Sequence, residues 1–226
     1  MTTLYLVRHG ENRANLTKEF SHRLIDYPLT PKGVLQAQQT AVFFRGKDIH
    51  AVYTSPLRRA QQTADLIAAP HGLRAIVLEG LREVNVGDLE RRPVSAENWA
   101  LNNRIIEDWL AGRVDSRFPD GEDYTMLWQR MQASLEQMVD HAEGRSVIAV
   151  GHGGIFTVTL RSICPDVNPQ WLRVRDNPNC SISEIAVTRR DGRLYGELIT
   201  WAAYSHLWGE AAELVSAVPQ PGELDS

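Results

Sequence analysis

Histidine, arginine and glutamate side chains stand close behind four short apolar runs of the sequence. In chain order they are Arg8, His9, Arg58, Arg59, Glu83 and His152, with Ser55 beside the second run. Guanidinium groups bind phosphoryl oxygens with a planar, two-pronged fork. An imidazole can attack phosphorus, and a carboxylic acid can protonate the leaving oxygen. These residue types predict phosphoryl transfer at one shared site.

The proposed roles depend on protonation states that neighbouring charges favour. Arginines beside an imidazole disfavour its protonated form, which keeps the nitrogen lone pair available for attack. A phosphate dianion beside a carboxyl group favours the protonated acid. A metal site made of His9, His152 and Glu83 is the competing interpretation. Arg8 would repel a divalent ion there, so we expect neither a metal nor another cofactor.

Alternating strand and helix patterns place these residues at one edge of a sheet. The apolar runs 4–7, 51–53, 75–78 and 147–150 predict buried strands. A long loop is expected over 10–29, a helix capped by Thr30, and another opened by Ser55 and Pro56. Further helices are expected over 95–111, 122–143 and 153–163, and a hairpin over 182–201. Ligands bind at the carboxyl ends of such parallel strands.

We therefore predict an α/β fold, a three-layer sandwich with helices on both faces of a mostly parallel sheet. One domain is expected over residues 1–226, with a small helical lid-like insert over about 93–120. The polar, proline-containing tail over about 212–226 is expected to fray. Trp99, Trp109 and Trp128 are expected to serve packing, with a role in lining a pocket left open.

Composition restricts the partners. The chain has 226 residues, 43% hydrophobic and 23% charged, and its net charge is −4. Nucleic acid is therefore not expected as a partner. Cys164 and Cys180 form no ligand or disulfide framework, the run before Arg8 is too short for a signal-peptide core, and no stretch is long enough to span a membrane. We expect a cytoplasmic protein that binds a small phosphorylated metabolite, with a homodimer left open.

An ordered set of motifs resembles the histidine phosphatase superfamily, in its phosphoglycerate mutase-like branch. The matching segments are Leu6–Glu11, Asp26–Thr30, Tyr53–Ala60 with Thr63–Ala64, Leu81–Glu83 with Gly87–Asp88 and Glu90, Phe118–Glu122, Gly151–Gly154 and Asn179–Ile182. Each motif alone is a weak pattern, but the ordered set is specific. Together the motifs cover roughly residues 4 to 200.

The resemblance implies a role for each matching residue. His9 would be the phosphorylated nucleophile, and Glu83 the proton donor and then acceptor. Arg8, Arg59 and His152 would hold the phosphoryl group, with Asn15. Spacing alone leaves Arg58 and Arg59 open, but the family's arginine stands directly before the alanine, which selects Arg59. Arg58 would then be solvated.

Further substrate contacts are expected from Gly153, which follows His152 in the fourth motif, and from positions where the sequence departs from the family. His22 and Arg23 stand where the family often has Gln-Gly, although a solvated loop is the other interpretation. Asn12 replaces a common Thr or Ser. Leu89-Glu90-Arg91 stands where Trp-Glu-Gly is usual. These departures bear on the substrate and leave the reaction class intact.

The predicted activity is metal-independent hydrolysis of small phosphomonoesters through a phosphohistidine. One alternative is a cofactor-dependent phosphoglycerate mutase, which would use the same residues. True mutases of the family carry a longer insert before the second histidine, with extra cations, whereas this insert is modest. A non-catalytic module that binds phosphorylated ligands is the second alternative. It should have lost a residue of the predicted site, and none is lost.

Overall fold

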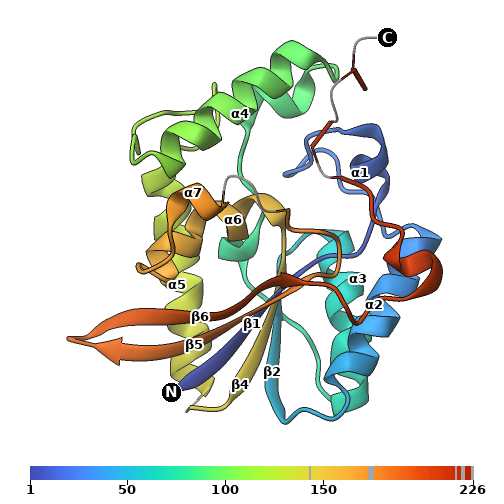
Figure 1. Ribbon diagram of the computed structural model, residues 1–226, viewed down its shortest axis with the longest axis vertical. Helices are drawn as coiled ribbons and strands as arrows, with labels where there is room; N and C mark the ends of the chain where they lie inside the picture. The colour runs from blue at the N-terminus through green and yellow to red at the C-terminus, as the bar shows by residue number, and fades with distance from the viewer. Residues whose placement is uncertain (143, 173–175, 217, 220–221, 225–226) are drawn as a thin grey trace.

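The computed structural model describes residues 1–142, 144–172, 176–216, 218–219 and 222–224. Its strands are β1 (Thr2–Arg8), β2 (Ile49–Thr54), β3 (Ile76–Val77), β4 (Ser146–Gly151), β5 (Ile182–Arg190) and β6 (Arg193–Ala203). Its α-helices are α1 (Arg13–Thr17), α2 (Pro31–Phe44), α3 (Arg58–Ala68), α4 (Ala96–Leu110), α5 (Tyr124–Ala142), α6 (Gly153–Ile163) and α7 (Pro169–Leu172) (Figure 1). Strands and helices alternate through the first four strands, as predicted.

The strands form one sheet in the order β3-β2-β4-β1-β5-β6. The first four strands are parallel to one another, while β5 is antiparallel to β1 and β6 is antiparallel to β5. The predicted hairpin turns at Asp191 and Gly192, whose φ values of 50° and 77° suit a tight two-residue turn. The expected α/β fold with a mostly parallel sheet is confirmed.

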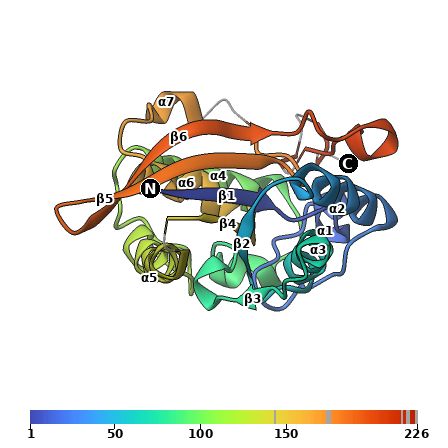
Figure 2. The ribbon, with the colours of Figure 1, turned by 90° about the horizontal axis from the view of Figure 1, so that it is seen from below.

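Helices cover both faces of the sheet because neighbouring strand residues point to opposite sides. Leu4 and Leu6 of β1 belong to the core cluster that includes residues of α5 and α6. Tyr5 and Val7 belong to the cluster that includes residues of α2 and α3. Figure 2 shows α5 and α6 on one side of β2 and β4, and α2 and α3 on the other. The carboxyl end of β1 is therefore held from both sides.

Two glycines let α2 approach the end of β1 closely. A Cβ on Gly10 would lie 2.4 Å from the carbonyl oxygen of Gly33, and one on Gly33 would lie 2.0 Å from that of Glu11. A real side chain at either position would force the two backbones apart. The predicted cap of α2 is present as well, because Thr30 Oγ1 accepts a hydrogen bond from the Gly33 amide at 3.0 Å.

Three local predictions differ from the structure. The apolar run 75–78, expected as a buried strand, forms only the two-residue strand β3, whose Ile76 and Val77 are 45% and 47% exposed because β3 is at the edge of the sheet and pairs with β2 alone. The expected loop over 10–29 contains the short helix α1, capped by Asn12, and Asn is a good cap although the Ser/Thr-x-x-Glu pattern is absent. The helix expected to open at Ser55 and Pro56 instead begins at Arg58. Leu57 occupies the N-cap position, and the Ser55 hydroxyl lies before the helix, where it accepts from the Leu57 amide at 3.3 Å and is paired with His152.

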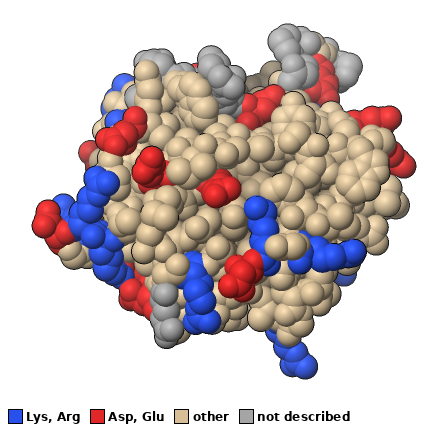
Figure 3. Space-filling model, turned by 60° about the horizontal axis from the view of Figure 1, so that its bottom comes forward, with Lys and Arg blue, Asp and Glu red and all other residues tan. Residues whose placement is uncertain are grey.

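The described surface carries both charge signs. Figure 3 shows one face on which basic and acidic side chains are interspersed between uncharged atoms. Among the described helices, none combines the length and apolar character that crossing a membrane requires. At the C-terminal end, Lys18 Nζ donates to the carbonyl oxygen of Ser216 at 2.8 Å. The expected fraying of the tail stays a prediction.

Candidate active site

Neighbouring strand ends bring the predicted residues together. The His9 amide donates to the carbonyl oxygen of Gly151 at 2.9 Å, and the Ser55 amide to that of Val150 at 2.9 Å. The loops after β1, β2 and β4 therefore start side by side. The imidazole centroids of His9 and His152 lie 5.1 Å apart. One sheet edge thus gathers both histidines, as the sequence predicted.

The hydrogen bonds of His9 identify Nε2 as its unprotonated nitrogen. Nδ1 lies 2.7 Å from the carbonyl oxygen of Gly10, so Nδ1 carries the proton and donates. Arg59 Nε donates to Nε2 at 3.1 Å. Because a guanidinium only donates, Nε2 must be the unprotonated nitrogen. His9 therefore presents a neutral imidazole in the form that a phosphorus nucleophile requires.

His152 is fixed in the opposite tautomer by the same arginine. Arg59 Nη2 donates to His152 Nδ1 at 3.1 Å, which makes Nδ1 the acceptor. His152 Nε2 therefore carries the proton, and it lies 2.7 Å from Ser55 Oγ. Arg59 therefore bridges the imidazole rings of His9 and His152.

Burial and neighbouring guanidinium groups keep both imidazoles neutral. Burial lowers the pKa of His9 well below its usual 6.5, and Arg59 and then Arg8 add to the shift. The pKa of His152 is lowered in the same way by burial, Arg59 and His9. Burial also lowers the pKa of each of the two arginines, to about 10, which leaves both charged at neutral pH.

Arg59 and its neighbour Arg58 occupy opposite environments. Arg59 is 3% exposed, whereas Arg58 is on the solvent side of α3. Ser21 anchors Arg59, because Nη1 donates to the Ser21 hydroxyl and Nη2 to the Ser21 carbonyl oxygen, both at 2.8 Å. The choice of Arg59 agrees with this geometry.

Two buried N–H groups at the site have no hydrogen-bond partner among the described residues. One is Arg8 Nε and the other is Asn12 Nδ2, and both side chains line the cavity that contains His9. Arg8 Nη1 is held by the carbonyl oxygen of Asn177 at 2.5 Å. Gly153 lies against Arg8, since a Cβ there would be 3.3 Å from Arg8 Nε. Buried donors of this kind favour an anion that accepts from them.

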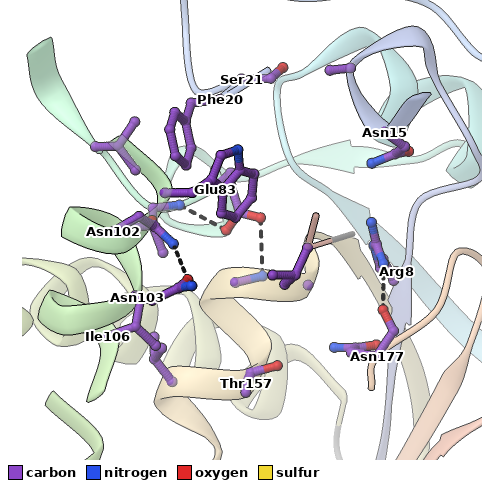
Figure 4. Close-up of a pocket in the computed structure, with 18 of the residues that line it drawn as sticks. Arg8, Asn15, Phe20, Ser21, Glu83, Asn102, Asn103, Ile106, Thr157 and Asn177 are labelled. Carbon is purple, nitrogen blue, oxygen red and sulfur yellow. Dashed lines mark hydrogen bonds between the residues drawn. The ribbon is translucent and has the colours of Figure 1, made fainter. Parts of the chain in front are cut away.

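Asn15 is oriented by its amide oxygen, which accepts from the Asn12 amide at 3.0 Å and from Asn179 Nδ2 at 3.1 Å. With the oxygen so engaged, its Nδ2 group is turned toward the cavity, as Figure 4 shows. Asn179 also donates to the carbonyl oxygen of His9 at 2.9 Å. Asn179 therefore connects the late N-x-S motif to the loop that carries His9.

Glu83 lies at the amino end of α6. Its Oε1 accepts from the amides of Val84 and Ile155 at 2.8 Å, and its Oε2 accepts from the Gly154 amide at 3.1 Å. A Cβ on Gly154 would lie 2.7 Å from Oε1, so a glycine is required for this contact. Oε2 accepts fewer of these bonds and is the oxygen with capacity to carry a proton.

Arg130 holds the main chain that carries Glu83. Its Nη2 donates to the carbonyl oxygen of Glu83 at 3.0 Å, and its Nη1 to that of Arg82 at 2.6 Å. Glu122 in turn accepts from Arg130 Nη2 at 2.7 Å. Sequence reasoning matched Glu122 to a motif but missed Arg130, because the partners of Arg130 lie far away in the chain.

His22 and Arg23 lie apart from the His9 cavity. Both line a smaller neighbouring cavity of about 380 Å³. His22 Nδ1 donates to the carbonyl oxygen of Glu83 at 2.8 Å, and burial lowers the pKa of His22. His22 therefore contacts the backbone of Glu83. A substrate contact from His22 or Arg23 stays a prediction.

Glu90 is an organising residue whose role the sequence did not reveal. Its Oε1 accepts from four successive amides, those of residues 22–25, at 2.7, 2.7, 2.9 and 3.1 Å. Glu90 is 8% exposed. Ser21, which holds Arg59, directly precedes this loop. No local sequence pattern indicates a partner so far away.

The cavity has a volume of about 470 Å³. Arg8, Asn15 and Asn177 lie on one side of it in Figure 4, and Phe20, Asn102 and Ile106 on the other. The part of the chain that is described contains no group of three or more His, Cys, Asp or Glu side chains that could hold a metal ion. The convergent groups suit a phosphoryl unit attached to a larger organic moiety.

Comparison with known proteins agrees with this geometry. The family model described as the histidine phosphatase superfamily (branch 1) matches residues 4–197. This chain belongs to the histidine phosphatase superfamily.

Relatives named "Probable phosphoglycerate mutase GpmB" are 34% identical over 193 residues in Yersinia enterocolitica and 35% identical over 197 residues in Escherichia coli O139:H28. Each match covers 82% of this chain and 85% of the relative. Phosphoserine phosphatase from Entamoeba histolytica, solved in complex with 3-phosphoglyceric acid, is 26% identical with a TM-score of 0.73, covering 92% of this chain and 100% of that one. Bacillus stearothermophilus YhfR is 26% identical with a TM-score of 0.74, covering 91% and 99%.

Proposed function

We propose that this protein hydrolyses small phosphomonoesters through a phosphohistidine at His9, without a metal ion. The observation that carries the proposal is the state of His9: a buried neutral imidazole whose Nε2 lone pair meets the guanidinium of Arg59 at 3.1 Å. Arg8 and Asn12 add unpartnered donors to the same cavity. This combination suits one tetrahedral anion held beside a nitrogen nucleophile.

The first half of the reaction forms the phosphohistidine. A phosphoryl oxygen replaces Nε2 as the acceptor for Arg59, and Arg8 and Asn15 supply further donors, while His152 holds Arg59 through Nδ1. A direct contact from His152 to the phosphoryl group needs a proton on Nδ1 and stays a prediction. Nε2 attacks phosphorus in line, the ester P–O bond breaks, and the leaving oxygen takes the proton from the Glu83 carboxyl.

The second half returns the enzyme to its starting state. A water oxygen attacks phosphorus and gives a proton to the Glu83 carboxylate. The P–N bond breaks, its electron pair returns to Nε2, and inorganic phosphate leaves.

A second candidate is phosphoryl return to a second oxygen of the product, as in a mutase. The names of the 34–35% identical relatives favour it. Supplying 3-phosphoglycerate with a bisphosphoglycerate primer separates the two reactions. Hydrolysis releases inorganic phosphate faster than 2-phosphoglycerate forms, and the opposite ratio identifies a mutase.

The proposed intermediate is tested by rapid quenching with p-nitrophenyl phosphate in the presence of a chelator. We expect an acid-labile, alkali-stable phosphoryl group on His9, found by peptide mapping. His9→Ala should lower turnover by about 10⁴-fold or more, since the nucleophile is lost. The exposed His141→Ala is the control. Turnover near wild type in His9→Ala, or loss of activity with the chelator, contradicts the proposal.

We also propose a cytoplasmic location. Cys164 and Cys180 are free and buried, and burial raises the pKa of each thiol to about 12. Reduced, unreactive thiols are typical of a reducing compartment. Labelling the native and the denatured protein with a thiol reagent should show two thiols only after unfolding.

A further inference from the structure

Helix α4 buries one face in the core and turns the other toward the active-site cavity. Ile105 and Trp109 are buried in the core cluster. The residues of α4 that line the cavity are Trp99, Asn102, Asn103, Ile106, Glu107 and Leu110. Their three- and four-residue spacing places them on one side of the helix. A single helix face therefore forms much of the wall opposite Arg8.

The aromatic part of this wall is held in place. The Phe20 and Trp99 rings lie 4.6 Å apart between centroids, with 33° between their planes. Trp99 Nε1 donates to the carbonyl oxygen of Lys18 at 3.1 Å, which fixes the indole. Both side chains are half-buried and line the cavity. Oriented aromatic surface of this kind favours a flat ring packed against it.

Two amides stand next to the aromatic pair. Asn102 Nδ2 donates to Asn103 Oδ1 at 3.2 Å, which leaves Asn102 Oδ1 and Asn103 Nδ2 for other partners. Figure 4 shows both amides on the α4 side of the cavity. The wall therefore offers one acceptor and one donor without a formal charge.

The two ends of the cavity differ in charge: the end at His9, called the phosphate end, and the end at α4. Among the described lining residues the only cations are Arg8 and Arg59, both at the phosphate end. Glu107 lies on the α4 side and Glu19 precedes Phe20. If the leaving alcohol carried a second anionic group, these carboxylates would repel it, and no cation among the described lining residues at this end would offset the repulsion.

We propose that the α4 wall selects phosphomonoesters whose leaving alcohol carries a flat, uncharged ring, which packs against Phe20 and Trp99 with its polar edge at Asn102 and Asn103. The cavity volume of about 470 Å³ accommodates such a group. This proposal names the substrate class of the phosphomonoester hydrolysis proposed above, and it rests on that function.

The test compares three primary alkyl esters, so that the leaving oxygens are chemically matched. They are 2-phenylethyl phosphate, glycerol 3-phosphate and 3-phosphoglycerate, each assayed for phosphate release. The wild type should favour 2-phenylethyl phosphate over 3-phosphoglycerate by about tenfold or more in kcat/KM. Equal or greater use of 3-phosphoglycerate overturns the selection while leaving the phosphatase proposal intact. No release from any ester or from p-nitrophenyl phosphate overturns both.

Variants of the α4 wall distinguish a loss of ring packing from a loss of activity toward all esters. Trp99→Leu should lower the ratio of kcat/KM for 2-phenylethyl phosphate to that for glycerol 3-phosphate by about tenfold, whereas Trp99→Phe should restore most of it. Phe20→Leu should act in the same direction. The exposed Trp208→Leu is the control and should leave the ratio unchanged. An unchanged ratio in Trp99→Leu, or equal loss with both esters, contradicts ring packing.

Discussion

The phosphate end of the cavity is made by strand ends and buried charges, whereas the opposite end is made mainly by one face of α4. At the phosphate end, Arg59 bonds His9, His152 and Ser21, three residues from three separate segments. At the α4 end, most of the lining side chains come from a single helix, with Phe20 beside them. The two ends therefore depend on the rest of the molecule to different degrees.

This difference indicates which part of the cavity controls the rate of reaction and which part controls the choice among esters. A change at Arg59 disturbs several segments at once, so the phosphate end tolerates little variation. A change at Trp99 or Asn102 alters one surface and leaves the strand ends in place. We expect changes at the phosphate end to slow all esters and changes on α4 to alter their ranking.

Glu83 gives the largest expected effect of the variants that follow, because the proposed reaction takes the proton for the leaving oxygen from its carboxyl group. Glu83→Gln should slow alkyl esters by about 10²–10⁴-fold and p-nitrophenyl phosphate much less, since a good leaving group needs little proton transfer. Single-turnover rates with both esters measure it, with Glu79→Gln as the exposed control. Equal slowing of both esters would argue against Glu83 as the acid.

Arg59 tests the phosphate end directly. Arg59→Lys should lower kcat/KM by about 10²–10³-fold for every ester, because a lysine cannot donate to His9, His152 and Ser21 at once. The adjacent Arg58→Lys should behave as wild type, since Arg58 is on the solvent side. If Arg59→Lys changed the ranking of esters without slowing them all, the division between the two ends would be wrong.

Glu90 tests whether the loop over residues 21–25 positions Arg59. Glu90→Ala should lower kcat/KM by about tenfold for all esters, since four amides lose their shared acceptor. Glu90→Gln should restore most activity, because its oxygen can still accept. Combined with Arg59→Lys, the loss should be less than additive. Full additivity would show that Glu90 acts elsewhere.

The smallest effect concerns stability as a function of pH. The folded-state pKa of His9 lies well below 6.5, so the unfolded chain binds more protons as the pH falls below about 6.5. The free energy of unfolding should therefore decrease from pH 7 to pH 5, by up to about 1.4 kcal/mol per pH unit from this residue. Urea unfolding of wild type and His9→Asn at both pH values isolates the contribution. Identical pH dependence in the two proteins would contradict the neutral, buried imidazole.

Local patterns in the sequence predicted most of the elements and much of the site. Apolar runs are visible in any short window, so the strands ending near His9 and His152 were placed correctly, as was the helix now seen as α4. The motif order selected Arg59 over Arg58, and the buried position of Arg59 agrees. The exceptions are local as well: Asn12 caps a helix in the expected loop, the third helix begins after Ser55, and the run 75–78 forms only a short, exposed edge strand.

Only the tertiary structure decided which distant groups meet. Glu90 binds amides more than 60 residues away, Arg130 holds the Glu83 backbone, and Ser55 pairs with His152. It also turned Trp99 toward the cavity and Trp109 into the core. The physical reason is that periodicity reports which residues are buried, whereas the packing of whole elements determines what they are buried against.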